Sequence, residues 1–202
     1  MDIYDLIAEG EHQQQDFKYC ISSVSKIAHT LSAFANTDGG RLLVGVRDNG
    51  RIAGVVGEEE IYMIDAAARS YCSPAVDCQM DTVRAEGRTV LIATISASEH
   101  RPIQAIEEDG TRRAYIRLAD ENILASPVHL ALWHQESHGT SRVFTEDEMH
   151  LLRIIPAQGM TLNRFTRQSR LSRHQAVRLL SHYVRYGLIS MVWKSPHWIF
   201  LP

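Results

Sequence analysis

Apolar residues recur at intervals of three and four positions along residues 22–35, where Val24, Ile27 and Leu31 fall on one side of a helix. This spacing predicts an amphipathic helix that buries one face. The nearly continuous apolar run at residues 42–46 follows two glycines and predicts a central strand covered on both faces. A helix and a buried strand in direct succession indicate a domain that mixes both kinds of element.

The segment Asp48-Asn49-Gly50 predicts a hairpin turn, because Asn-Gly is the strongest short-range signal for one, with a return strand at residues 52–56. Alternation at Asp16-Phe17-Lys18 predicts a short strand with Phe17 inward and both charged residues on the other face. The remaining pattern predicts helices at residues 3–8 and 58–71 and strands at residues 76–83, 90–95 and 113–118. Segregated strands with a few helices predict an α+β domain.

The pattern changes after residue 144. The capping residues Thr145, Thr161 and Ser172 each precede a helical pattern, and two short strands at residues 188–193 and 198–201 follow Gly187. Three helices and a hairpin predict a small winged helix-turn-helix domain. We therefore expect a first domain at residues 1–136, a linker at residues 137–144 and the winged domain at residues 145–202.

Charge is divided unevenly between these parts. Residues 1–148 contain all 24 Asp and Glu but only 13 of the 21 Lys and Arg, which gives a net charge of −11. Residues 149–202 contain eight Lys and Arg and no acidic residue, which gives +8. Such asymmetry predicts two domains, the second of which faces an anion.

The helix predicted from residue 173 to about residue 186 presents polar side chains opposite its apolar stripe. These are Arg173, His174, Gln175, Arg178, His182 and Arg185. Arginine can read guanine and glutamine can read adenine in a major groove, while further cations contact phosphates. The predicted nucleic-acid-binding residues are Arg164, Arg167, Arg170, Arg173, His174, Gln175, Arg178, Arg185 and Lys194. A winged helix that makes protein contacts or dimerises is the alternative.

Several motifs of the first domain occur in a characteristic order: E-x4-D-F-K, then AFANTDGG, then LLVGVRDNGRIAGV, SEHRP and AYIRLADENILASP. This order resembles the Schlafen AlbA-like domain, a nucleic-acid-binding module of many bacterial proteins, over roughly residues 5–130. The resemblance implies a mixed-sheet α+β fold. Because active Schlafen proteins contain two such lobes, it also implies a homodimer for a chain with one.

In catalytically active Schlafen proteins three carboxylates hold a divalent metal for RNA cleavage. By motif, the resemblance places these catalytic and metal-binding residues at Glu11, Asp16 and Asp48, with Mg²⁺ or Mn²⁺ as the cofactor of a nuclease and no other cofactor indicated. Hard oxygen ligands suit that chemistry. The residues also allow structural interpretations, in which Asp48 opens the turn, Asp16 pairs with Lys18 and Glu11 is solvated.

Three functions follow as hypotheses. The first is a DNA-binding transcriptional regulator, with RNA as the alternative ligand; the second is a metal-dependent ribonuclease of the Schlafen type; the third is a protein-interaction adaptor. No apolar run reaches membrane-spanning length and the N-terminus does not resemble a signal peptide, so we expect a cytoplasmic protein with no membrane partner. The three cysteines indicate neither a disulfide framework nor a zinc site.

Overall fold

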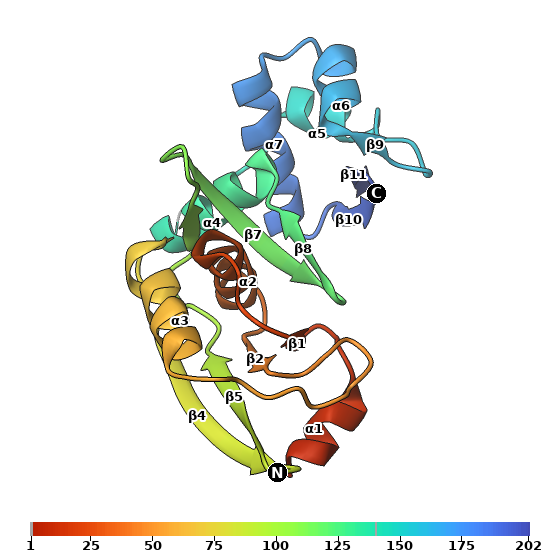
Figure 1. Cartoon of the computed structure of the whole chain (residues 1–202). Coiled ribbons are helices and arrows are strands. Elements are labelled where there is room, and N and C mark those ends of the chain that lie inside the picture. Colours follow the sequence, from red (N-terminus) through yellow and green to blue (C-terminus); the bar gives the residue numbers. More distant parts are fainter. Residues whose placement is uncertain (1, 140) are drawn as a thin grey trace. The chain divides into compact units, whose positions relative to one another are not determined.

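The computed structural model of the chain describes residues 2–139 and 141–202 (Figure 1). It divides into two compact units, Met1–Leu124 and Ala125–Pro202. The helix α4 (Pro127–His138) belongs to the second unit, where it packs against α7 (Arg173–Arg185). The sequence-based boundary at residue 136 falls inside this helix, because the apolar residues of α4 form no one-sided stripe that would reveal which core the helix joins.

The first sheet of the first unit has the strand order β1-β2-β5-β4. Its strands are β1 (Gln15–Lys18), β2 (Gly40–Val44), β4 (Cys78–Ala85) and β5 (Arg88–Ile95). β1 runs parallel to β2, and the other neighbours are antiparallel. β1, β2, β4 and β5 correspond to four strands that the sequence predicts, and the predicted α+β class is confirmed.

Three helices supply the apolar residues that cover this sheet: α1 (Ile3–Glu9), α2 (Val24–Asn36) and α3 (Glu59–Ser70). Residues of α2 and α3 form one core cluster with Leu42 and Val44 of β2, whereas α1 joins a separate cluster that contains Phe17 and Leu43. Because neighbouring residues of a strand point to opposite faces, β2 contributes side chains to both clusters and is apolar throughout its buried part.

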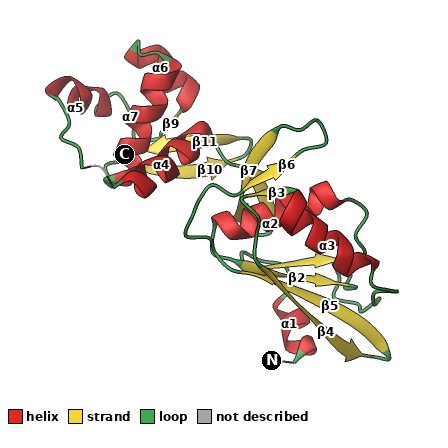
Figure 2. Cartoon of the chain, turned by 90° about the vertical axis from the view of Figure 1, so that its left-hand side faces the viewer, coloured by secondary structure: helices red, strands yellow, loops and turns green. Residues whose placement is uncertain are grey.

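A second sheet has the order β3-β6-β7-β8. Its strands are β3 (Cys72–Ser73), β6 (Gln104–Ile106), β7 (Arg112–Leu118) and β8 (Glu121–Leu124). Residues of β6, β7 and β8 contact α2. Figures 1 and 2 show α2 between the two sheets, which explains why ten of its thirteen residues are buried rather than one face alone.

Asn36, the last residue of α2, joins this helix to the second sheet. Its side-chain Nδ2 donates to the carbonyl oxygens of Ile103 at 2.7 Å and Tyr115 at 2.9 Å, and its Oδ1 accepts from the Ile103 N–H at 2.8 Å. Gly39 follows with φ +69°, and an added Cβ would lie 2.7 Å from the Ile95 carbonyl oxygen. The motif AFANTDGG therefore connects α2 to the second sheet as well as ending the helix.

The turn after β2 forms as predicted, but the return strand does not. The Gly50 N–H donates to the Arg47 carbonyl at 2.7 Å, and only one bridge, between Val46 and Ile52, follows. Gly54 then adopts φ +78°, which takes the chain out of extended conformation. The prediction of a strand at residues 52–56 is wrong because β5, from a distant part of the sequence, occupies that side of β2.

The second unit contains three further helices and a sheet of order β10-β11-β9. These elements are α5 (Glu146–Leu152), β9 (Met160–Thr161), α6 (Leu162–Ser169), α7, β10 (Ser190–Lys194) and β11 (His197–Leu201). Thr145, Thr161 and Ser172 cap the three helices, as the sequence predicts. None of the described helices of residues 2–139 and 141–202 is long and apolar enough to cross a membrane.

Candidate functional site

The second unit has exposed cationic side chains on α6, α7 and the hairpin. Arg164 and Arg167 are exposed on α6, Arg170 ends that helix, and Lys194 ends β10. We call the basic face the exposed set Arg164, Arg167, Arg170, Arg173, His174, Arg178 and Lys194. No Asp or Glu occurs after Glu148 to neutralise this face. Arg185, also predicted here, is half-buried.

The polar side chains in the first turns of α7 differ in their hydrogen bonds. Gln175 belongs to a capping box: its Oε1 accepts from the Ser172 N–H at 2.9 Å, while its own N–H donates to Ser172 Oγ. Arg173 Nη1 donates to Asn163 Oδ1 at 2.8 Å. Within residues 2–139 and 141–202, no hydrogen bond engages the side chains of His174 and Arg178, and Arg178 lines a hollow together with Asp147 and Glu148 of α5.

His182 lies on a different face from the one that the sequence predicts. Its exposed fraction is 7%, because α4 packs against α7. Nearby on α7, Ser181 Oγ accepts from Gln135 Nε2 of α4 at 2.6 Å. Burial lowers the pKa of His182, and the charges of Arg142, Arg178 and Arg185 lower it further. A neutral, buried imidazole contributes no cation to the basic face.

In the first unit the structure brings Glu11 close to Asp16. Glu11 Oε1 accepts from the Phe17 N–H at 2.9 Å. Asp16, with an exposed fraction of 3%, lies with Oδ1 3.1 Å from Arg117 Nη2 and Oδ2 2.5 Å from Lys18 Nζ. Burial raises the pKa of Glu11, and the negative charge of Asp16 adds to that rise. The predicted shared face of Asp16 and Lys18 is confirmed.

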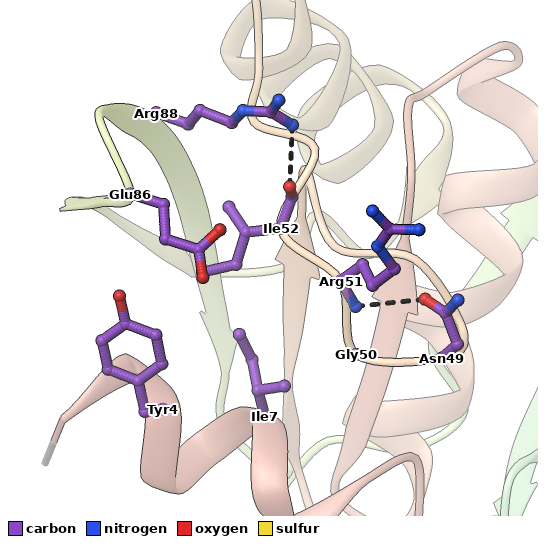
Figure 3. Close-up of a pocket in the computed structure, with 8 residues that line it drawn as sticks. All are labelled: Tyr4, Ile7, Asn49, Gly50, Arg51, Ile52, Glu86 and Arg88. Carbon is purple, nitrogen blue, oxygen red and sulfur yellow. Dashed lines mark hydrogen bonds between the residues drawn. The ribbon is translucent and has the colours of Figure 1, made fainter.

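Asp48 lies apart from this pair. Asp16 is paired with Leu42 across β1 and β2, whereas Asp48 is exposed in the turn beyond the end of β2. The residues after Asp48 line a hollow of about 320 Å³ together with α1 and the hairpin between β4 and β5. In Figure 3 Tyr4 and Ile7 of α1 lie opposite this turn, and Arg88 donates to the Ile52 carbonyl at 2.8 Å.

The three carboxylates therefore do not fit a divalent metal site. Within the described ranges 2–139 and 141–202, no three His, Cys, Asp or Glu side chains lie together as metal ligands would. Both oxygens of Asp16 also have a cationic nitrogen beside them. We derive no cleavage step through a metal from this arrangement.

Sequence reasoning missed Arg117, whose side chain is 1% exposed. A charged residue within a predicted strand gives no sign of burial, because its carboxylate partner is a hundred residues distant along the chain. Only the folded structure, in which the Arg117 side chain of β7 reaches β1, reveals the pair.

The first unit is thus an α+β domain in which the central helix α2 lies between two sheets. A family model described as Schlafen, AlbA_2 matches residues 11–126, more than half of the chain. The chain belongs to this family.

Two solved structures illustrate the likeness. The DIP2311 protein from Corynebacterium diphtheriae matches with a TM-score of 0.50 at 20% identity, over 84% of this chain and 32% of that protein. The N-terminal domain of a RecG-related protein from Nitrosomonas europaea matches with a TM-score of 0.46 at 24% identity, over 58% of this chain and 88% of that domain. This chain thus spans about a third of the length of the first protein, and the likeness to it concerns the fold alone. The curated proteins give no match.

Proposed function

We propose that the chain is a DNA-binding transcriptional regulator whose second unit is a winged helix-turn-helix. The observation that carries the proposal is the basic face of α6, α7 and β10, which no acidic residue after Glu148 offsets. A phosphate backbone is the ligand that such a predominantly cationic surface suits best. The order of three helices and a hairpin, with β9 added to the sheet, supports the winged architecture.

Membership of the Schlafen, AlbA_2 family supports nucleic acid as the ligand class. The units also differ in charge in the expected direction. Residues 1–124 contain 12 Lys and Arg against 20 Asp and Glu, whereas residues 125–202 contain nine against four. The net charges of −8 and +5 favour the second unit as the one that contacts DNA.

Within the basic face we assign two roles. His174 and Arg178, whose side chains are exposed on α7, contact base edges in the major groove. Arg164, Arg167, Arg170 and Lys194 contact phosphates and position the helix. Gln175 keeps its role in the capping box, since a bidentate contact with adenine would need the Oε1 that accepts from Ser172.

The test is duplex binding by the whole chain, measured by fluorescence anisotropy at increasing salt. The double variant Arg164→Ala/Arg178→Ala should bind at least about tenfold more weakly, because the base contact of Arg178 contributes roughly 1–3 kcal/mol and Arg164 supplies a phosphate contact. It should also show a shallower salt dependence. Arg112→Ala, which removes an exposed arginine of the first unit outside β4, is the matched control and should bind like the wild type.

Two outcomes would contradict the proposal. One is a wild-type chain that does not bind duplex DNA at low salt, which would favour the adaptor hypothesis. The other is unchanged affinity and salt dependence in the double variant. Repeating the assay with single-stranded RNA and with Mn²⁺ or EDTA separates RNA binding and cleavage from DNA binding.

We further propose that the chain is a homodimer joined through the outer edge of β4. β4 is an edge strand of the first sheet, and it has eight residues. The opposite edge strand, β1, has its backbone groups engaged by the side chains of Glu11 and Arg117. An open edge of this length is a template for a further strand.

A further inference from the structure

We infer that Asp16, one of the positions that the family resemblance assigns to a metal, forms with Arg117 a buried joint that fastens the second sheet to the first, while Glu11 holds the edge of β1. The cations of that joint are Arg117 and Lys18 rather than a divalent metal. The inference concerns the first unit and goes beyond the DNA-binding proposal, which concerns the second. It begins from the disagreement between the expected ligand set and the observed one.

Arg117 is the centre of the joint. It belongs to β7 of the second sheet, and its Nη2 lies 3.0 Å from the Gln15 carbonyl and 3.1 Å from Asp16 Oδ1, both in β1 of the first sheet. Its Nη1 donates to Asn122 Oδ1 at 3.0 Å, and its guanidinium carbon lies 5.2 Å from the centre of the Phe34 ring. A guanidinium buried to this degree is stable only when its donors and its charge are satisfied, as they are here.

The backbone of Arg117 is held as firmly as its side chain. Its N–H donates to Thr37 Oγ1 at 2.9 Å, just after the end of α2, and its carbonyl accepts from Gln13 Nε2 at 3.0 Å. Gln13 Oε1 in turn accepts from the Ala119 N–H at 2.9 Å. The loop before β1 and the end of β7 are thus connected by side chains as well as by packing.

Asp16 has no open position for a metal ion. Its Oδ1 lies beside Arg117 and its Oδ2 beside Lys18 Nζ. A divalent cation at Asp16 would have to displace the half-exposed Lys18 ammonium group and to lie beside the buried Arg117 guanidinium, which would repel it. The carboxylate is already neutralised by the chain itself.

Glu11 has a structural contact that accounts for its position. Its carboxylate accepts from the Phe17 N–H, a donor at the outer edge of β1. An unpaired N–H at this half-buried edge would be costly. The side chain of Glu11 therefore takes the place of a neighbouring strand.

The inference is tested by a double-mutant cycle on the whole chain, with Asp16→Asn, Arg117→Met and the combination. Urea denaturation followed by circular dichroism gives the midpoint of each. Each single variant should lower the midpoint strongly, because it removes one member of the buried Asp16–Arg117 ion pair, and Lys18 is too exposed to replace the guanidinium. The double variant should lower the midpoint by clearly less than the sum of the two single losses. The exposed positions Glu108→Gln and Arg112→Met, outside β4, are the matched control and should leave the midpoint nearly unchanged.

The metal part is tested by titrating the wild-type chain with Mn²⁺ and counting free ions by electron paramagnetic resonance. We expect no stoichiometric Mn²⁺ binding and no rise of the urea midpoint in millimolar Mn²⁺. Additive losses in the cycle would overturn the joint. If the wild-type chain binds one Mn²⁺ and Glu11→Gln or Asp48→Asn abolishes that binding, the metal part is overturned. These two variants keep the test decisive even if Asp16→Asn fails to fold. Neither readout involves DNA, so failure here is distinct from failure of the proposed function.

Discussion

Among single residues, His129 shows how a buried titratable group serves local structure. It is the third residue of α4, and its Nδ1 lies 3.1 Å from the Ser126 N–H, which donates to it in a capping box. Its ring also lies edge-on to Trp198, with centroids 4.5 Å apart. A protonated ring could not accept at Nδ1, so the helix start requires the neutral form.

We predict that this imidazole makes the protein less stable in mild acid. Burial lowers the pKa of His129 from 6.5 to about 4. Since the unfolded chain then binds more protons than the folded one between these values, stability is complete above pH 6.5 and falls as the pH drops toward 4. The free energy of unfolding should decrease by about 2 kcal/mol between pH 7.5 and pH 5.

Urea denaturation at the two pH values measures this change. His129→Gln should flatten the pH dependence of the free energy of unfolding. His150 is exposed, so the control variant His150→Gln should keep the pH dependence of the wild type. A His129→Gln protein with the full wild-type dependence would show that the loss arises elsewhere, with the buried His182 as the next residue to replace.

At the level of elements, the end of α6 combines a conformational cost with a charge. Arg170 is the C-cap of this helix and has φ 58°, in the left-handed region. Glycine is the usual residue at such a position, because a Cβ there is strained. An exposed arginine in its place adds a cation to the basic face next to the start of α7.

Arg170→Gly should therefore raise the free energy of unfolding by up to about 1 kcal/mol and still weaken duplex binding. The matched control is Arg167→Gly, which removes the same charge within the helix and should lower stability by about 1 kcal/mol. Thermal unfolding and anisotropy on both variants separate the two effects. Equal stability changes in the two variants would disprove the conformational argument.

For the whole molecule, the open edge of β4 sets the expected assembly. Ala85 and Arg88 close a two-residue turn between β4 and β5, so their backbone groups pair with each other and those of even-numbered β4 residues point outward. Thr82 is exposed near the middle of this row. A second copy can pair there by continuing the sheet.

We predict a solution mass of twice the 22.8 kDa of one chain by light scattering. Thr82→Pro, which removes an outward N–H, should give monomers, while Thr82→Ala keeps the N–H and should remain dimeric. A wild-type mass of one chain would exclude the dimer. A folded, dimeric Thr82→Pro protein would exclude this edge as its interface.

Much of the fold was predictable, since most elements follow from local patterns. The stripe at Val24, Ile27 and Leu31 predicts α2, and Ser172 predicts the start of α7. The return strand at residues 52–56 was not predictable, because β5 competes for the same side of β2 from a distant part of the chain. The burial of His182 depends likewise on α4, which periodicity did not assign to the second unit.

The candidate sites divide in the same way. The sequence by itself determined the basic face, because the eight Lys and Arg after Glu148 are accompanied by no acidic residue and fall on predicted helices and a hairpin. It also determined the family, through motifs that are local in the chain. Tertiary structure alone decided whether the three carboxylates converge: Asp16 lies against Arg117, and Asp48 lies beyond the end of β2. Convergence of side chains depends on how strands are brought together by packing, and no local spacing encodes that.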